Sequence, residues 1–212
     1  MARRAEKGKT KDQEPQKLFY IFYNEERWTN WLTSLNEADF EGDSESEQMP
    51  EGLAMLYIFS EDITLSVLKI IKLWQNERFS KEDALDKLTA VEAIVMSPLP
   101  EGKLEEFVGP IQLTMLVLFA SCRRFMEGAF ETDLKVLVKK GKSLPEDQLE
   151  DALDCASNIG ASVINGATCC SKFVKDDLEN PTLFDEWLIE IETMGEAFKS
   201  LKKFDEEPGE SS

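Results

Sequence analysis

Residues 50–74 of this chain read PEGLAMLYIFSEDITLSVLKIIKLW, and this stretch decides the fold class. Side chains suited to a protein interior recur in it every three or four positions, which is the spacing of one face of an α-helix. They are Leu53, Leu56, Tyr57, Ser60, Thr64, Val67, Leu68, Ile71 and Trp74. The stretch therefore predicts one long helix whose apolar face lies in a core.

A shorter helix is expected ahead of it, beginning after Asn24. Asparagine is a preferred N-cap residue, and the two glutamates that follow it complement the positive end of a helix. Tyr23 and Trp28 occupy the two positions of a hydrophobic staple, and Trp28 and Trp31 are expected to be buried rather than to bind a partner. The aromatic run at 18–23 is expected to form a short extended segment.

The helical spacing continues through most of the remaining chain and is divided by turn residues such as Ser97–Gly102. Further helices are expected at about residues 80–95, 104–126, 131–139, 143–173 and 181–204. The second of these should be bent or divided at Gly109 and Pro110, because proline lacks an amide donor. We therefore predict an all-α fold, a single globular domain of six or seven helices at 18–204.

Local capping signals mark where three of these helices begin. Ser80 and Asp83 have the spacing of a capping box, and so do Ser143 and Glu146. Asn180, which is followed by a proline, is a good N-cap for the last helix, with the proline in its first turn.

The helix expected at 143–173 is rich in small residues, among them Gly160 and Gly166. Glycine costs about 1 kcal/mol relative to alanine inside a helix, so its presence there needs a reason. Close approach of a neighbouring helix is the favoured reason. A bend, or a ligand placed against exposed backbone, is the alternative.

Histidine is absent, and 42 acidic residues outnumber 24 basic ones to give a formal net charge of −18. Without histidine there is no Ser-His-Asp or Cys-His arrangement and no HExxH zinc site. The negative charge opposes broad contact with nucleic acid or anionic lipid. The longest strongly apolar run, Ile111–Ala120, is too short to span a membrane, so we expect a soluble protein.

Charge is unevenly distributed along the chain. Residues 1–17 carry six basic and three acidic side chains, a net charge of +3, and we expect them to form a disordered basic tail. The basic residues of this tail are Arg3, Arg4, Lys7, Lys9, Lys11 and Lys17. Residues 205–212 are expected to form a disordered acidic tail, and an acidic loop is expected at 37–49.

The acidic loop places an acid at every second position from Glu37 to Glu47. This alternation superficially resembles the start of an EF-hand loop. Counted from Asp43, however, Ala54 stands at the twelfth position, where calcium binding requires glutamate. We therefore assign no metal ion to the loop, while its serines leave phosphorylation open.

Cysteine is the one side chain here that would act as a nucleophile near neutral pH. Cys122 is a candidate because Arg123 and Arg124 follow it, but adjacent helical residues point in different directions, and a buried thiol is the favoured interpretation. The other cysteines are Cys155, Cys169 and Cys170. All four lack the spacing of a zinc knuckle and are interpreted as reduced thiols of a cytoplasmic protein.

Several groups of acidic residues could supply ligands for magnesium or a general base. Nothing distinguishes them from the other acidic residues of the surface. They are Glu105 with Glu106, Asp147 with Glu150 and Asp151, and Asp176 with Asp177. Gly141-Lys142-Ser143 matches the end of a P-loop, but Val136 stands where its first glycine belongs, and no strand precedes it. No catalytic, metal-binding or cofactor-binding residue is predicted, and no cofactor.

Two segments, KLFYIFYNEERWTNWLTSL at 17–35 and ENPTLFDEWLIEIE at 179–192, carry a resemblance to a known family. They resemble a family of conserved, uncharacterised proteins from methanogenic archaea, and the resemblance spans most of the chain beyond the basic tail. It implies an archaeal, cytoplasmic setting. It implies no activity for any residue.

Three functional hypotheses follow. The leading one is a non-enzymatic, cytoplasmic protein-interaction or adaptor protein that uses an apolar or acidic face. The second is association with RNA or ribosomes through basic side chains, namely Arg3, Arg4, Lys7, Lys9, Lys11, Lys135, Lys139 and Lys140. The third is an enzyme that uses a carboxylate-bound metal or a cysteine.

Overall fold

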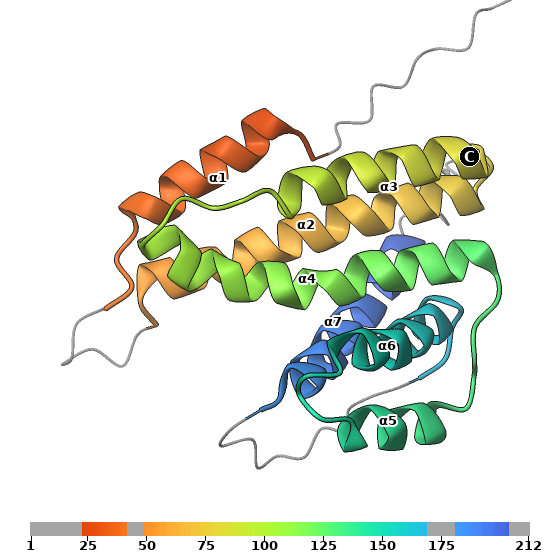
Figure 1. Ribbon diagram of the computed structural model, residues 1–212. Coiled ribbons are helices and arrows are strands. Elements are labelled where there is room, and N and C mark those ends of the chain that lie inside the picture. The colour runs from red at the N-terminus through yellow and green to blue at the C-terminus, as the bar shows by residue number, and fades with distance from the viewer. Residues whose placement is uncertain (1–22, 42–48, 169–180, 204–212) are drawn as a thin grey trace, which may run out of the picture.

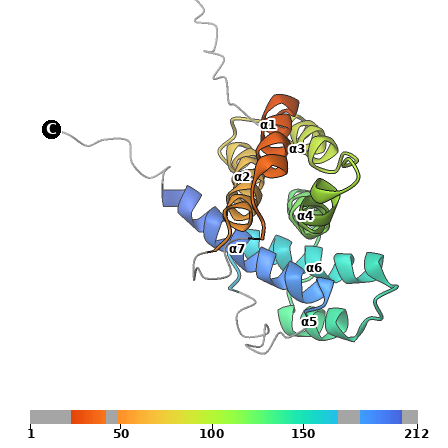
Figure 2. The ribbon, with the colours of Figure 1, turned by 90° about the vertical axis from the view of Figure 1, so that its left-hand side faces the viewer.

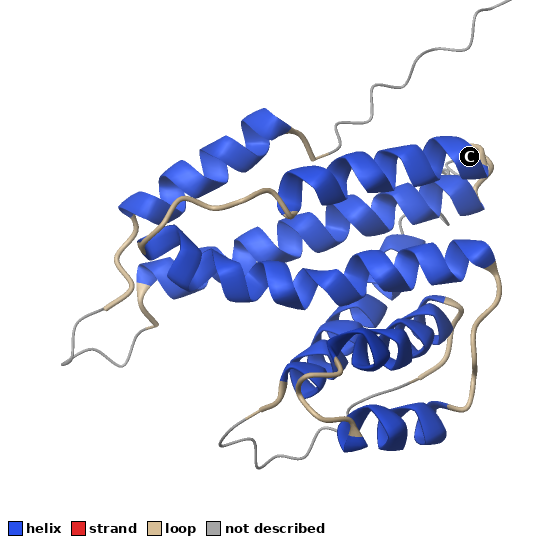
Figure 3. Cartoon of the chain, in the orientation of Figure 1, coloured by secondary structure: helices blue, strands red, loops and turns tan. Residues whose placement is uncertain are grey.

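A computed structural model describes residues 23–41, 49–168 and 181–203 of the chain. Within these residues there are seven α-helices and no strand (Figures 1 and 3). They are α1 (Glu25–Glu37), α2 (Glu51–Gln75), α3 (Lys81–Val95), α4 (Lys103–Glu127), α5 (Leu134–Ser143), α6 (Leu149–Ile164) and α7 (Leu183–Lys203). The predicted all-α single domain is confirmed.

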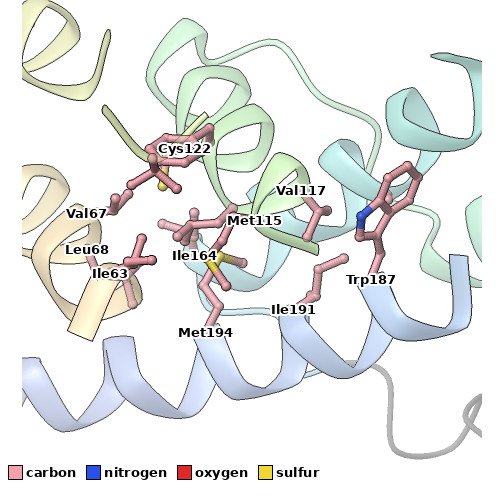
Figure 4. Close-up of a cluster of buried hydrophobic side chains, with 14 of the residues drawn as sticks. Ile63, Val67, Leu68, Met115, Val117, Cys122, Ile164, Trp187, Ile191 and Met194 are labelled. Carbon is pink, nitrogen blue, oxygen red and sulfur yellow. The ribbon is translucent and has the colours of Figure 1, made fainter. Parts of the chain in front are cut away.

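Helix α4 lies at the centre of the domain. It contacts every other described helix except α5. The helices α1, α2 and α3 lie on one side of it, and α5, α6 and α7 lie on the other (Figures 1 and 2). One continuous hydrophobic core joins the two sides, and in Figure 4 side chains of α2, α4, α6 and α7 meet around Met115 and Ile164.

Helix α6 is buried at every position from Cys155 to Ile164. A helix buried on all sides needs neighbours that approach closely, and small side chains permit this. At Gly160 an added Cβ would lie 1.9 Å from Oγ and 2.6 Å from Cβ of Ser121 on α4, which is far inside van der Waals contact. The predicted close approach is thus confirmed at Gly160.

The start of α1 follows the sequence prediction. The side chain of Asn24 accepts a hydrogen bond of 2.8 Å from the Arg27 amide, and the rings of Tyr23 and Trp28 lie 6.3 Å apart, edge to face, as a staple. Trp28 is buried, and the half-buried Trp31 donates a hydrogen bond of 2.9 Å from its indole nitrogen to Asp62 on α2. Both tryptophans serve the contact between α1 and α2.

The predicted capping box at Ser143 and Glu146 is wrong. Ser143 is the last residue of α5, and its hydroxyl donates to the carbonyl of Lys140 at 2.8 Å, so it closes one helix instead of starting the next. Helix α6 begins at Leu149 without a side-chain cap, and it ends at Ile164 rather than near residue 173. Gly166 lies outside the helix in a turn. Its φ of +104° is a left-handed conformation that favours glycine, which accounts for this residue.

The starts of the other helices follow the predictions in part. The capping box at Ser80 is confirmed. Helix α5 begins later than predicted, because the Asp133 side chain accepts a hydrogen bond from the amide of Val136 and caps the helix there. Helix α7 begins after Thr182, whose hydroxyl and amide both bond to the Asp185 side chain, so the proline at 181 precedes the helix. Helix α4 is one continuous helix that contains Pro110, so the predicted division at Gly109 and Pro110 is wrong.

Several predictions lie outside the described residues. These concern the basic tail at 1–17, most of the aromatic segment at 18–23, the middle of the acidic loop, Asn180 and the acidic tail at 205–212. Where the acidic loop is described, the Asp39 side chain accepts the Glu41 amide at 3.0 Å, which forms a short turn after α1.

Within the described residues, α4 is the one helix whose length and composition would suffice to cross a membrane. Helices in the cores of soluble proteins meet the same criterion, and nine residues of α4 are buried against its neighbours. That the protein is soluble therefore stays a prediction.

The approach of α4 to α6 generates a stability prediction. Gly160→Ala should lower the free energy of unfolding by about 1–3 kcal/mol, because the new methyl group meets Ser121. Chemical denaturation measures this change. Adding Ser121→Gly removes the opposing atoms, so the double variant should lose less stability than the sum of the two single variants. Strictly additive losses would show that the two positions are not in contact.

Candidate functional site

The first half of α2 and Met49, two residues ahead of it, expose four large apolar side chains. Met49 is 68% exposed, Leu53 40%, Tyr57 66% and Ile58 53%. These four are half of the eight large apolar residues that are exposed in the described part of the chain, and the other four are spread over α4, α5, α6 and α7. We call these four residues the α2 face. Apolar side chains gathered in this way mark interaction surfaces.

The α2 face continues the line along which α7 packs on α2. Leu53, Tyr57 and Thr64 are spaced by four and seven residues, so they follow one side of the helix. At Thr64 this side is covered, because the hydroxyl donates to Glu190 of α7 at 3.2 Å. Tyr57 lies about 10 Å back along the helix and stays exposed. Leu53 and Tyr57 therefore form the part of this line that α7 leaves uncovered, and Ile58, the residue after Tyr57, points about 100° to one side of it.

Two other positions of α2, Phe59 and Asp62, hold the helix in a fixed orientation. Phe59 is buried, and its ring lies 5.5 Å from Trp28 and 5.7 Å from Trp31. Arg27 of α1 pairs with both carboxylate oxygens of Asp62, a bidentate geometry that limits rotation. The α2 face is presented by a helix that is packed at Phe59 and paired at Asp62.

Acidic side chains border the α2 face. Glu51 and Glu61 are exposed on the same half of the helix, and the first basic residue of α2 is Lys69. The surface therefore combines an apolar centre with a negative edge, which favours partners that carry positive charge near apolar side chains.

Glu190, where α7 covers α2, is a buried acid that is hydrogen-bonded to a neutral hydroxyl group. Its side chain accepts a hydrogen bond from Thr64 and is only 8% exposed. Burial raises the pKa of Glu190 from 4.5 to about 7, and the Thr64 hydrogen bond offsets part of this rise. No sequence pattern distinguishes this residue, because it is one of several acids on α7.

The two described cysteines are core residues. Cys122 and Cys155 are buried, and burial raises the pKa of both thiols. The charge of Arg123 opposes the shift at Cys122 without cancelling it. Arg123 pairs with Glu92, and Arg124 pairs with the Asp154 carboxylate at 2.6 Å. Cys169 and Cys170 lie outside the described residues.

The acidic pairs do not assemble into a site. Among the described residues, no group of three or more acidic or cysteine side chains is arranged to hold a metal ion. Glu105 and Glu106 lie in the first turn of α4, Asp147 precedes α6, and Glu150 and Asp151 lie in the first turn of α6. Asp176 and Asp177 lie outside the described residues.

The partial P-loop match belongs to a helix end. Gly141, Lys142 and Ser143 form the last turn of α5. A Cβ at Gly141 would lie 2.0 Å from the Phe184 ring, so glycine is needed there for packing against α7. The ammonium group of Lys142 pairs with Asp185 at 2.7 Å. Burial raises the pKa of Asp185, but hydrogen bonds from Lys142 and Thr182 outweigh it and leave that pKa below its usual value.

Three of the predicted RNA-binding lysines, Lys135, Lys139 and Lys140, are exposed on α5. The predicted basic residues of the tail lie outside the described residues. Beside the end of α5, a cavity of about 340 Å³ opens between the α5–α6 turn and the start of α7. The cavity was not evident in the sequence, and the predicted burial of Leu53 and Tyr57 is wrong, because α7 does not cover this part of α2.

Comparison with protein families gives one match. Residues 21–207 match the model of a family described as an uncharacterised protein conserved in archaea (DUF2150), and the chain belongs to this family. No curated protein and no solved structure matches the chain.

The buried carboxyl group of Glu190 generates a pH prediction. Its pKa is raised in the folded protein, so its contribution to stability is present below the unfolded pKa near 4.5 and is lost as the pH rises through about 7. Glu190→Gln removes this titration. The unfolding free energy of the variant minus that of the unmodified protein should rise by on the order of 2–3 kcal/mol from about pH 5 to about pH 8.

Urea denaturation at the two pH values measures this gain. Glu192→Gln, on a partly exposed acid of the same helix, is the matched control and should show no such change. The same pH dependence in all three proteins would contradict the assignment of Glu190 as a destabilising buried charge above pH 7.

Proposed function

We propose that this archaeal protein acts without catalysis, as a cytoplasmic adaptor that binds a partner protein through the α2 face. The observation that carries the proposal is the exposure of Met49, Leu53, Tyr57 and Ile58 within ten residues at the start of a helix that is otherwise packed in the core. Side chains of this kind favour burial in an interface over contact with water.

The partner segment should carry apolar side chains with lysine or arginine beside them. Completing the burial of four half-exposed side chains contributes roughly 4–8 kcal/mol. Association itself costs at least about 4 kcal/mol in lost translational and rotational freedom. Apolar contact alone therefore gives weak binding, and pairing with Glu51 and Glu61 would supply both further affinity and faster association.

Charge disfavours a second copy of the chain on this surface. Two copies that met face to face would bring Glu51 and Glu61 of each toward the same residues of the other, at a net charge of −18 per chain. The partner is therefore expected to be a different protein. The alternative of a thiol or metal-carboxylate enzyme gains no specific observation, since the described cysteines are buried and the described acids are dispersed.

Site-specific crosslinking tests the proposal. A photoreactive benzoylphenylalanine placed at Tyr57 in archaeal cells should crosslink to a partner segment that is apolar and flanked by lysine or arginine. The same group at Leu113, an exposed apolar position on α4, is the matched control and should not capture that segment.

A substitution then checks that the face itself is needed. Tyr57→Glu should abolish crosslinking from a neighbouring probe at Leu53 while leaving unfolding stability within about 0.5 kcal/mol, because Tyr57 is mostly exposed. Capture of an acidic segment, or equal capture from Tyr57 and Leu113, would contradict the proposal. Capture of a second copy would replace the adaptor by a self-associating protein.

A further inference from the structure

Helix α5 differs in charge from every other described helix. Leu134–Ser143 contains four lysines and no acidic residue, whereas each of the other six described helices carries at least as many acidic as basic residues. The helix lies at the edge of the domain beside α6, in both views of the fold (Figures 1 and 2). The acidic protein thus has one positively charged helical surface within its described residues.

The lysines of α5 point outward because the other side of the helix is fixed in the core. Leu137 and Val138 are buried, and Gly141 admits the ring of Phe184. Lys135 and Lys139 are exposed and are spaced by four residues, so they lie on the same side, one turn apart. Packing therefore determines the direction in which these charges face.

The 340 Å³ cavity adjoins the C-terminal end of this surface. Its apolar lining residues include Leu144, Leu149, Ala152, Leu183, Phe184 and Trp187, and Glu146 also lines it. The ion pair of Lys142 and Asp185 lies where the cavity meets α5. A cavity of this size accommodates one large apolar side chain, which is how a peptide anchors itself in a partner.

We propose that the outer surface of α5 and the adjoining cavity form a second docking site, for an acidic protein segment that carries one large apolar anchor residue. The acidic residues lie along Lys135 and Lys139, and the anchor enters the cavity beyond the end of α5. This site is independent of the α2 face and differs from it in charge. An adaptor with both surfaces would distinguish two partners by the sign of their charge.

The dimensions of the surface favour a short acidic segment over RNA. Ten residues of helix extend about 15 Å, which is the length of four or five residues of extended chain. Acidic side chains stand just beyond both ends, namely Glu131 and Asp133 before the helix and Glu146 and Asp147 after it. A polyphosphate backbone that continued past either end would meet these negative charges, whereas a short acidic segment would extend only its uncharged anchor residue to the cavity that Glu146 lines.

Fluorescence anisotropy with synthetic probes tests the site on the full chain. The probe is a short dye-labelled peptide of glutamates with a phenylalanine at one end, and it is compared with the same peptide ending in glycine and with an oligouridine RNA. We expect the phenylalanine peptide to bind about tenfold more tightly than the glycine peptide, and RNA to bind more weakly than either.

Two sets of variants locate the binding. Lys135→Glu combined with Lys139→Glu should weaken the peptide at least about tenfold, while Arg78→Glu combined with Lys81→Glu changes the net charge equally at exposed positions elsewhere and should not. Leu149→Asp, at the exposed rim of the cavity, should remove the advantage of phenylalanine over glycine. Circular dichroism would confirm that each variant is folded.

Each other outcome overturns the proposal. Absence of peptide binding, or equal losses in the α5 and control variants, would mean that α5 is not a docking site. Tighter binding of RNA, with loss in the α5 variant, would assign the surface to nucleic acid instead. None of these results bears on crosslinking at Tyr57, so the two proposals fail separately.

Discussion

The close approach of α4 to α6 at Ser121 and Gly160 is the contact on which the rest of the structure depends. Because an added Cβ at Gly160 would lie 1.9 Å from the Ser121 hydroxyl oxygen, the two helices approach more closely than ordinary side chains permit. This lets α6 be buried from Cys155 to Ile164 and lets α4 contact helices on both of its sides. Helices α5 and α7 pack on α6 in turn, so the position of α6 determines where both lie.

The positions of the two candidate surfaces follow from how α7 and α5 pack on the core. Helix α7 covers α2 as far as Thr64 and leaves Tyr57 exposed, which gives an apolar surface with an acidic edge. Helix α5 packs through Leu137 and Val138 and turns its lysines outward. In both cases the inner side of the helix is held by burial, so the backbone of the outer side is already ordered before binding. Rigid presentation of this kind favours binding, because less conformational entropy is lost on association.

The sequence predicted the helices better than their ends or their exposed sides. Periodicity located α2, and local hydrogen-bonding chemistry correctly placed the starts of α1 at Asn24 and α3 at Ser80. The prediction of a cap failed at Ser143, because a serine hydroxyl can donate to a carbonyl at the end of one helix as readily as it caps the start of the next. Exposure of Tyr57 could not be predicted, since it shares the spacing of buried Thr64, and only the path of α7 distinguishes them.

Hydrogen exchange of backbone amides in the free protein tests most directly whether the domain is organised around α6. The amides from Cys155 to Ile164 should exchange only through global unfolding, at rates that match the unfolding free energy, whereas those of α5 should exchange faster through local opening. Exchange in α6 as fast as in α5, while α2 stays protected, would contradict the central place given to the contact between α4 and α6.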